Sequence, residues 1–274
     1  MPELKVLANA LHQEMHGAKI YSIGVLKGPY AIGIDVRYEQ FRNTINKLSA
    51  LMTKREIRVG MVVSMCKYIC IELLISACGD IPIYICVKNA KLAHAMSTHS
   101  ILELIFTDNK NPTITSRNVR NLYIDDSRSN CVIDIYTLDE LNTLRASLGP
   151  DPSEITLKQF HANVNKYPNK HIVDVISNDK VIGGIGNIYR CEALYIAKIN
   201  PLVLVKNLTE KQITLLHAAI KFVTLGALVS LRGDGEPVRY VYGLTITAKA
   251  EPVSVISLSR RQIWFVSDEN FAAQ

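Results

Sequence analysis

A connector rich in proline and glycine divides this chain into two parts of different character. The segment LGPDPSE, residues 148–154, contains Gly149, Pro150 and Pro152, which end a helix and stiffen the backbone. Short β-branched segments precede it, whereas apolar residues beyond it recur mostly at helical spacing. A chain of 274 residues is long enough for two domains with separate cores. We therefore predict an N-terminal domain over 1–147, a linker over 148–153 and a C-terminal domain over 154–274.

The N-terminal part is predicted to contain one helix followed by an antiparallel sheet. Apolar residues from Leu4 to Met15 recur at helical spacing, so the chain enters an amphipathic helix at once. Strands without intervening helices predict a β-sandwich or barrel. Thr137 and Glu140 form a capping-box pattern that predicts a new helix. The predicted strands are residues 19–26, 30–36, 55–63, 67–76, 81–88, 101–108 and 131–137.

The C-terminal part is predicted to be helical and to end in a β-hairpin, which makes the fold class α+β. A second capping box, Thr209 to Gln212, opens the longest helix. A short link near Glu251 is predicted to join two β-like runs into a hairpin or a small ribbon. The predicted helices are residues 154–165, 170–178, 187–197 and 209–230, and the β-like runs are 238–249, 251–259 and 260–266.

Composition restricts the kind of protein. The net charge of +6 and the pI near 8.9 permit an anionic partner without requiring one. No run of 18 apolar residues occurs and the N-terminus is unlike a signal peptide, so we expect an intracellular protein that spans no membrane. No CxxC pair occurs, which predicts reduced, buried thiols and no zinc site.

The stretch from Val181 to Pro201, VIGGIGNIYRCEALYIAKINP, combines a glycine-rich turn with a helical pattern. Such a turn can cradle a cofactor phosphate, hold a nucleic-acid backbone, or connect two core helices. A dinucleotide site needs a third glycine in register, and Asn187 follows Gly186 instead. A P-loop needs a Lys-Ser/Thr pair after the turn, which is also missing.

Residues 183–201 resemble the helix–two-turns–helix motif of the formamidopyrimidine-DNA glycosylase/endonuclease VIII family of base-excision repair enzymes. The similarity covers the glycine turn, the Asn, the aromatic residue after Asn-Ile, the Glu-Ala-Leu and the closing Pro. LGPDP also resembles the interdomain connector of this family. The motif is moderately specific, because ribosomal and topoisomerase proteins carry related turns.

The N-terminus MPEL is similar to the opening of family members, in which Met1 is removed and Pro2 becomes the terminal residue. The resemblance implies that Pro2 is the nucleophile and that Glu3 supplies a proton. An α-amino group is partly neutral near pH 7, so it can attack where a lysine would be protonated. Members often carry two Pro-Glu pairs and this chain carries one, so Pro2-Glu3 aligns with either of them.

Three further residues match positions that contact DNA in the family. Lys67, in MCKYICIEL, corresponds to a catalytic lysine that contacts phosphate, and Arg261, in SRRQIWFVSDE, to the arginine of the C-terminal hairpin. Asn187 is predicted both to cap its helix and to bind phosphate. Lys170 is either a residue of the DNA channel or an ordinary surface lysine. Because no cysteine follows Cys191, the hairpin resembles the subgroup without zinc, and Trp264 is expected to pack in the core.

The residues that fill the void of a flipped base are matched least well. Met96 is a candidate wedge, and Arg117 or Arg120 is a candidate for the family's arginine.

The resemblance implies a DNA glycosylase for oxidised bases with an associated abasic-site lyase activity, acting through an imine on Pro2. We expect no cofactor and no metal, damaged DNA as the partner, a monomer, and a nuclear or nucleoid location in a cell. The alternative is a non-catalytic DNA- or RNA-binding protein that keeps the helix–two-turns–helix motif.

Overall fold

The computed structural model describes residues 1–26, 36–52, 55–76, 81–107, 119–128, 130–233, 235–258 and 261–267. The chain forms two compact units, Met1–Val6 with Ala146–Gln274 and Leu7–Arg145. We call them the helical unit and the sheet unit. The division after Arg145 lies close to the predicted boundary after residue 147, while the first six residues group with the helical unit.

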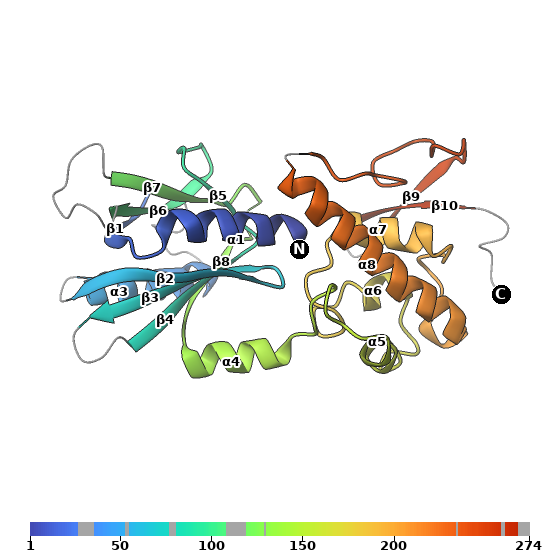
Figure 1. The fold of residues 1–274 in the computed structure, drawn as a ribbon, viewed down its shortest axis with the longest axis horizontal. Coiled ribbons are helices and arrows are strands. Elements are labelled where there is room, and N and C mark those ends of the chain that lie inside the picture. The colour runs from blue at the N-terminus through green and yellow to red at the C-terminus, as the bar shows by residue number, and fades with distance from the viewer. Residues whose placement is uncertain are drawn as a thin grey trace. The chain divides into compact units, whose positions relative to one another are not determined.

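The sheet unit is built on a single antiparallel sheet of eight strands in the order β5-β7-β6-β1-β2-β3-β4-β8. Its four-stranded halves are joined where β1 meets β2 at one residue pair, Lys19 with Arg58 (Figure 1). Alternating apolar residues of the strands, such as Ile71, Leu73 and Leu104, form the buried core of this unit. The strands are β1 Lys19–Val25, β2 Glu56–Met65, β3 Tyr68–Ser76, β4 Ile81–Lys88, β5 Lys91–Ala93, β6 Ser100–Thr107, β7 Val119–Asp125 and β8 Val132–Thr137.

In the part of the chain that the structure describes, three helices accompany this sheet: α1 Pro2–Met15, α3 Val36–Met52 and α4 Leu138–Ser147. Helix α1 begins in the helical unit and continues in the sheet unit. The predicted capping box of α4 is confirmed, since Thr137 and Glu140 exchange side-chain bonds with each other's backbone N–H. Helix α3 was not predicted, and the strand predicted before it at 30–36 lies outside the described residues except for Val36.

The helical unit contains α5 Leu157–Val164, α6 Ile172–Val175, α7 Asn187–Ile196, the 3₁₀ turn η1 Val205–Asn207 and α8 Glu210–Arg232. Helices α7 and α8 pack on each other over a core that includes Phe160, Leu194 and Leu216. The predicted box of Thr209 and Gln212 caps α8. A further box, Thr156 with Gln159, caps α5, and its T-x-x-Q pattern was missed in the sequence.

Two glycines are required where the connector packs against the turn between α6 and α7. Gly184 has φ of 78°, in the left-handed region that side chains disfavour. A Cβ on Gly149 would lie 2.7 Å from the backbone carbon of Val181, so only glycine allows this close approach. The connector is also bonded to the turn, because Gly183 N–H donates to the Pro150 carbonyl over 2.8 Å. The predicted connector and the glycine turn therefore form one packed structure.

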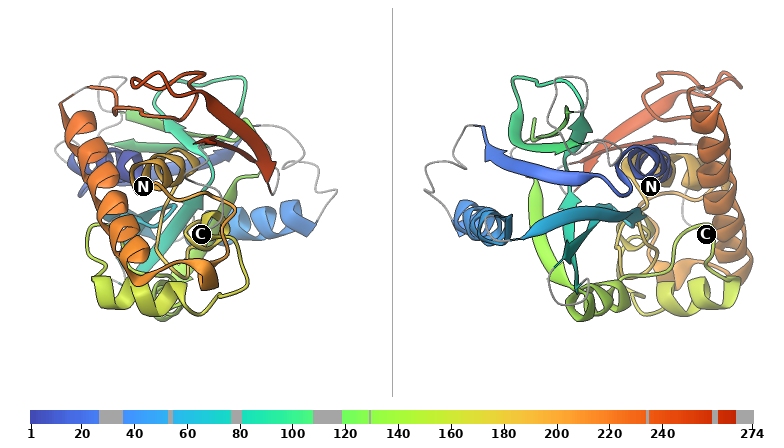
Figure 2. Two further views of the ribbon diagram at one scale, coloured as in Figure 1. Left: turned by 90° about the vertical axis from the view of Figure 1, so that its right-hand side faces the viewer. Right: turned by 60° about the vertical axis from the view of Figure 1, so that its left-hand side comes forward.

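The chain ends in a hairpin of β9 Val253–Leu258 and β10 Arg261–Val266, and β10 packs against α7 (Figure 2). A hairpin is present, with Leu258 of β9 paired with Arg261 of β10, whereas the runs on either side of Glu251 are joined by one bridge and form no strand pair. The strand predicted at 238–249 is wrong, since that segment has no regular structure beyond one bridge, Ile246 with Pro252. Trp264 packs on this core, as predicted, with its ring centroid 4.3 Å from that of Tyr242.

Among the described residues, α8 is the one helix whose length and composition would allow it to cross a membrane. Seven of its residues are buried within the helical unit, including Leu216, Ile220 and Val223. A core helix passes the same test of length and composition. The absence of a membrane span therefore stays a prediction.

Candidate active site

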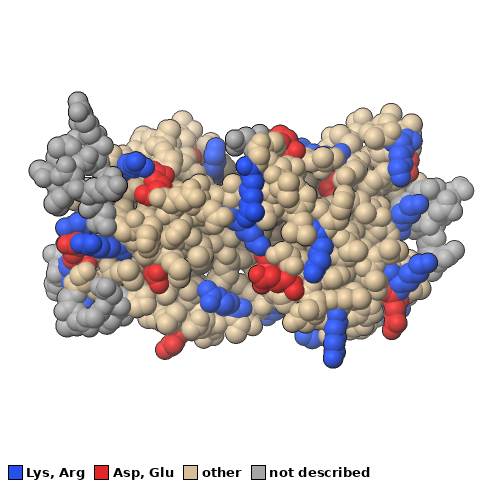
Figure 3. Space-filling model, viewed as in Figure 1, with Lys and Arg blue, Asp and Glu red and all other residues tan. Residues whose placement is uncertain are grey.

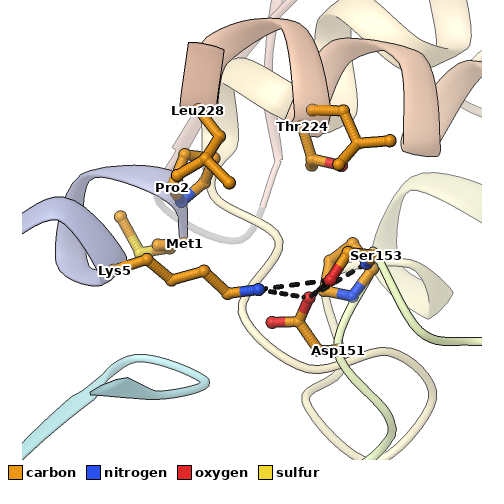
Figure 4. Close-up of a pocket in the computed structure, with 9 residues that line it drawn as sticks. Met1, Pro2, Lys5, Asp151, Ser153, Thr224 and Leu228 are labelled. Carbon is orange, nitrogen blue, oxygen red and sulfur yellow. Dashed lines mark hydrogen bonds and ion pairs between the residues drawn. The ribbon is translucent and has the colours of Figure 1, made fainter. Parts of the chain in front are cut away.

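The N-terminal residues are fixed to the connector by an ion pair. Lys5 Nζ lies 2.8 Å from Asp151 Oδ1 and 3.2 Å from Ser153 Oγ. Burial alone would raise the pKa of Asp151, but the hydrogen bonds from Lys5 and Ser153 outweigh it and hold that pKa below its usual range. Pro2 is buried beside this pair and lines a small pocket with Thr224 and Leu228 of α8 (Figure 4).

Met1 precedes Pro2, and its carbonyl accepts the N–H of Lys5 over 3.2 Å as the first bond of α1. The nitrogen of Pro2 is therefore an amide nitrogen while Met1 is attached. Pro suits this first helical position, because its fixed φ matches a helix and no N–H is needed there. The resemblance implies removal of Met1, and the backbone at Pro2 already has the geometry of a helix start.

Glu3 is bonded to the glycine-turn helix. Tyr189 Oη donates to Glu3 Oε1 over 2.5 Å, and Glu3 Oε2 is buried with no partner in the described part of the chain. Burial, followed by the bond to Glu3, raises the pKa of Tyr189 far above its ordinary value, so the phenol remains a donor. Glu3 is thus held next to α7 with one carboxylate oxygen free for another proton partner.

We expect Tyr189→Phe to slow a reaction step that uses Glu3 by about tenfold, because one hydrogen bond that orients the carboxylate is lost. Binding of DNA should be unchanged, since the hydroxyl faces Glu3. Single-turnover base excision measures the effect. Tyr195→Phe is the matched control, because Tyr195 lies on the same helix and donates to Glu251 instead. Equal rates for the two variants would contradict a role for the Tyr189–Glu3 bond.

Asn187 does not cap its helix. The N-cap of α7 is Gly186, which makes no side-chain cap bond, and Asn187 is the first helical residue. Its Nδ2 donates to the carbonyl of Gln262 over 2.9 Å, and its Oδ1 accepts from Arg190 Nε over 2.7 Å. The capping prediction was wrong because both ends of the amide are engaged elsewhere. The phosphate-binding role stays a prediction.

The same bond places Asn187 beside the hairpin that carries Arg261. Arg261 is exposed and begins β10, one residue before Gln262, opposite Leu258 of β9. A planar guanidinium at a strand end can bind phosphate oxygens in pairs. The helical unit therefore brings together two predicted site residues, Asn187 and Arg261, that are far apart in the sequence.

Glu192 is a buried carboxylate whose role was not predicted. It is 2% exposed and accepts the backbone N–H groups of Tyr240, Val241 and Tyr242 over 2.8, 3.2 and 2.8 Å. These bonds fix the segment after α8 onto α7. The Glu-Ala-Leu of the motif was visible in the sequence, but the backbone partners were not.

Glu192→Ala is expected to lower the free energy of unfolding by about 3 kcal/mol, because three N–H groups lose a charged acceptor. Denaturant titration of the full chain measures this change. Glu154→Ala, at an exposed position, serves as the control and should change stability by less than about 0.5 kcal/mol. A loss below about 1 kcal/mol for Glu192→Ala would contradict the anchoring role.

The two predicted lysines lie in turns. Lys67 follows Cys66 in the turn between β2 and β3 of the sheet unit, and is not within β3. Cys66 has φ of 54°, a strained value for a residue with a side chain. Lys170 is exposed before α6, and its backbone bonds to Tyr167 and Val205. The roles of both lysines stay predictions.

Of the wedge candidates, Met96 is 62% exposed in the sheet unit, whereas Arg120 is paired with Glu14 over 3.0 Å. Arg117 lies outside the described residues. An exposed thioether is free to enter a base stack, and a paired guanidinium must first leave its carboxylate. Met96 is a candidate for the wedge and Arg120 for the family's arginine, and both roles stay predictions.

Charges of both signs are mixed on one face of the molecule. Lys and Arg side chains are distributed across the face in Figure 3, with acidic side chains between them. Anion binding on this face would therefore depend on a few placed groups rather than on one large basic field. In the described ranges, no group of three or more His, Cys, Asp or Glu residues could hold a metal ion.

A family model and several relatives match part of the sequence. A family model described as the formamidopyrimidine-DNA glycosylase H2TH domain matches residues 148–235. A formamidopyrimidine-DNA glycosylase of Glaesserella parasuis is 33% identical over 118 residues, which cover 38% of this chain and 43% of that protein. An uncharacterized formamidopyrimidine-DNA glycosylase-like protein of Mycobacterium tuberculosis is 36% identical over 89 residues, which cover 32% of this chain and 56% of that protein. The chain thus matches less than two thirds of the length of each relative.

Solved structures share the fold over nearly the whole chain. The Lactococcus lactis formamidopyrimidine-DNA glycosylase bound non-covalently to DNA with an AP site superposes with a TM-score of 0.75, at 21% identity and 97% coverage of both chains. MutM in complex with DNA containing carbocyclic 8-oxo-G superposes with a TM-score of 0.74, at the same sequence identity and coverage. The predicted α+β class, with its N-terminal sheet, helical domain and terminal hairpin, is confirmed.

Proposed function

We propose that this chain, a member of the formamidopyrimidine-DNA glycosylase/endonuclease VIII family, removes oxidised bases from DNA and then cleaves the strand as an abasic-site lyase. The observation that carries the proposal is the bond from Tyr189 to Glu3. It holds Pro2-Glu3, the proposed reacting pair, against the helix of the glycine turn. The same helix begins with Asn187, a proposed phosphate contact.

The proposed chemistry begins after removal of Met1. The secondary amine of Pro2 attacks C1′ of the damaged nucleoside, the bond from C1′ to the base breaks, and the base leaves with a proton. Glu3 donates the proton that opens the deoxyribose ring while the base is being expelled, so release of the base depends on this proton, and the product is an iminium ion between Pro2 and C1′. Loss of the C2′ proton then expels the 3′ phosphate, and a second elimination can expel the 5′ phosphate. No cofactor enters these steps.

The remaining proposed residues bind the DNA backbone. Arg261 and Asn187 would contact phosphates from the helical unit, and Lys67 would do so from the sheet unit. Lys170 is proposed as a weaker contact of the same kind. The proposed partner is damaged DNA, bound by a monomer. The similar structures are complexes with DNA that contains carbocyclic 8-oxo-G and with DNA that contains an AP site, which supports this class of substrate.

Arg261→Gln is expected to reduce the slope of log affinity against log salt concentration by about 0.9, the value for one lost phosphate contact. Affinity should fall for every DNA sequence alike, because a phosphate contact carries no base information. Fluorescence anisotropy at several salt concentrations measures the slope. Lys158→Gln, which removes an exposed cation on α5, is the control with an unchanged slope. An unchanged slope for Arg261→Gln would remove this residue from the site.

The proposed function is tested with labelled duplexes that carry one oxidised base, one abasic site or no lesion. We expect release of the oxidised base and cleavage of the strand at both lesions, with the undamaged duplex left intact. Binding to the lesions without base release or cleavage would instead indicate a non-catalytic binding protein.

A further inference from the structure

A buried arginine lies behind Asn187 with no role in the proposed chemistry. Arg190 is 4% exposed, and its Nε donates to Asn187 Oδ1 over 2.7 Å. Its Nη1 donates to Ser177 Oγ over 2.5 Å, and the Ser177 hydroxyl donates to the Val173 carbonyl over 2.6 Å. A chain of bonds thus runs from α6 through the guanidinium to the first residue of α7.

Burial of the charged Arg190 guanidinium is electrostatically unfavourable. Burial is the largest factor that lowers the pKa of Arg190, and the nearby cation Arg261 lowers it further, while Cys191 and Asp174 oppose this. The group remains charged, because arginine does not lose its proton in proteins. Its Nη2 is buried without a partner within the described ranges. A buried cation with an unused donor is destabilising, which points to a function other than stability.

The bond to Arg190 decides which way the amide of Asn187 faces. Arginine has donors and no acceptor, so the amide oxygen must face Arg190 and the NH₂ group must face away. One hydrogen of that NH₂ goes to the Gln262 carbonyl, and the second hydrogen is available for another acceptor. With the amide turned by 180°, an oxygen would face an incoming phosphate and repel it.

We propose that Arg190 is a positioning residue that holds the Asn187 amide with its NH₂ group toward a DNA phosphate. The proposal rests on the proposed function, since it assumes that DNA is the ligand. Arg190 acts through Asn187 and does not itself contact the DNA.

A double-mutant cycle on the full chain tests the proposal. The probe is a fluorescent duplex with a tetrahydrofuran abasic-site analogue, bound at one fixed salt concentration. Arg190→Gln should weaken binding about tenfold, the value of one hydrogen bond of about 1.4 kcal/mol. In the Asn187→Ala background, Arg190→Gln should have no further effect, because the amide that it positions is gone.

Three further variants separate positioning from folding. Asn187→Asp keeps an acceptor for Arg190 but has no N–H, so it should fold normally and lose at least about tenfold in affinity. Arg190→Lys keeps the charge and should restore only part of the binding, since it lacks the planar fork that reaches both Asn187 and Ser177. Ser177→Ala removes one support of the guanidinium and should weaken binding about threefold. If Arg190→Gln does not fold, the last two variants carry the test.

The outcomes are distinct. If Arg190→Gln lowers DNA affinity equally in the wild-type and Asn187→Ala backgrounds, Arg190 has a merely structural role. If Arg190→Gln binds DNA with wild-type affinity, or if Arg190→Lys and Ser177→Ala both do, Arg190 has no role in binding. Either result overturns the proposal. If the wild-type chain does not bind the duplex at all, the proposed function fails and the positioning role fails with it. Binding by the wild-type chain with a non-additive cycle supports both.

Discussion

Protein in which any residue precedes Pro2 is expected to lose strand cleavage at abasic sites, whereas protein processed to Pro2 should cleave them. The reason lies in the nitrogen of Pro2. In a peptide bond it is an amide nitrogen without a nucleophilic lone pair, and as a chain terminus it is a secondary amine. An α-amino group is partly neutral near pH 7, so the processed terminus can act as a nucleophile.

The comparison uses two tags on otherwise identical chains. A tag ahead of Pro2 should reduce single-turnover cleavage of an abasic duplex below detection, and the same tag after Gln274 should leave it intact. Intact-mass measurement confirms whether Met1 has been removed. In Pro2→Gly, processed in the same way, the rate of strand cleavage should fall at least about a hundredfold, because a primary amine forms an imine that must gain a proton before elimination. Full cleavage by the N-terminally tagged chain would contradict the assignment of Pro2.

Glu3→Gln is expected to slow base excision by about 10²–10⁴, the usual contribution of a positioned acid or base. Glutamine has nearly the same size, and its amide oxygen can still accept the Tyr189 hydroxyl that now binds Oε1. What it lacks is a carboxyl proton to give to the sugar. The variant should therefore fold and bind DNA as the wild type does, and fail at the chemical step.

The measurement is single-turnover excision with excess protein, alongside anisotropy for binding. Glu236→Gln, whose carboxylate is 90% exposed, is the matched control and should excise at the wild-type rate. Excision by Glu3→Gln within about threefold of the wild type would show that Glu3 does not transfer the proton.

Elements with strong local patterns were predicted correctly. The capping boxes at Thr137 and Thr209 mark helix starts in both the sequence and the structure, because each is a bond between residues three apart. The connector around Pro150 was recognised because its prolines and glycine restrict the backbone locally. Helix α3 was missed although Ile45 and Leu48 lie at helical spacing and are buried, since an apolar segment before it favoured a strand.

The errors arose where distant residues decide the structure. The segment 238–249 has an alternating, strand-like pattern, yet the N–H groups of 240–242 bond to the Glu192 carboxylate and not to another strand. Asn187 looked like a helix cap, but Arg190 and the Gln262 carbonyl occupy its amide. In the candidate site, the residue types were visible in the sequence. The contacts that orient them, Tyr189 on Glu3 and Arg190 on Asn187, required the fold.

The central claim is that the amine of Pro2 forms a covalent intermediate with damaged DNA. Sodium borohydride, added while the processed chain acts on an abasic duplex, reduces an imine to a stable amine bond. The account predicts a protein–DNA adduct in which peptide mapping places the nucleotide on Pro2. No adduct despite intact DNA binding, or an adduct on a lysine side chain, would contradict it.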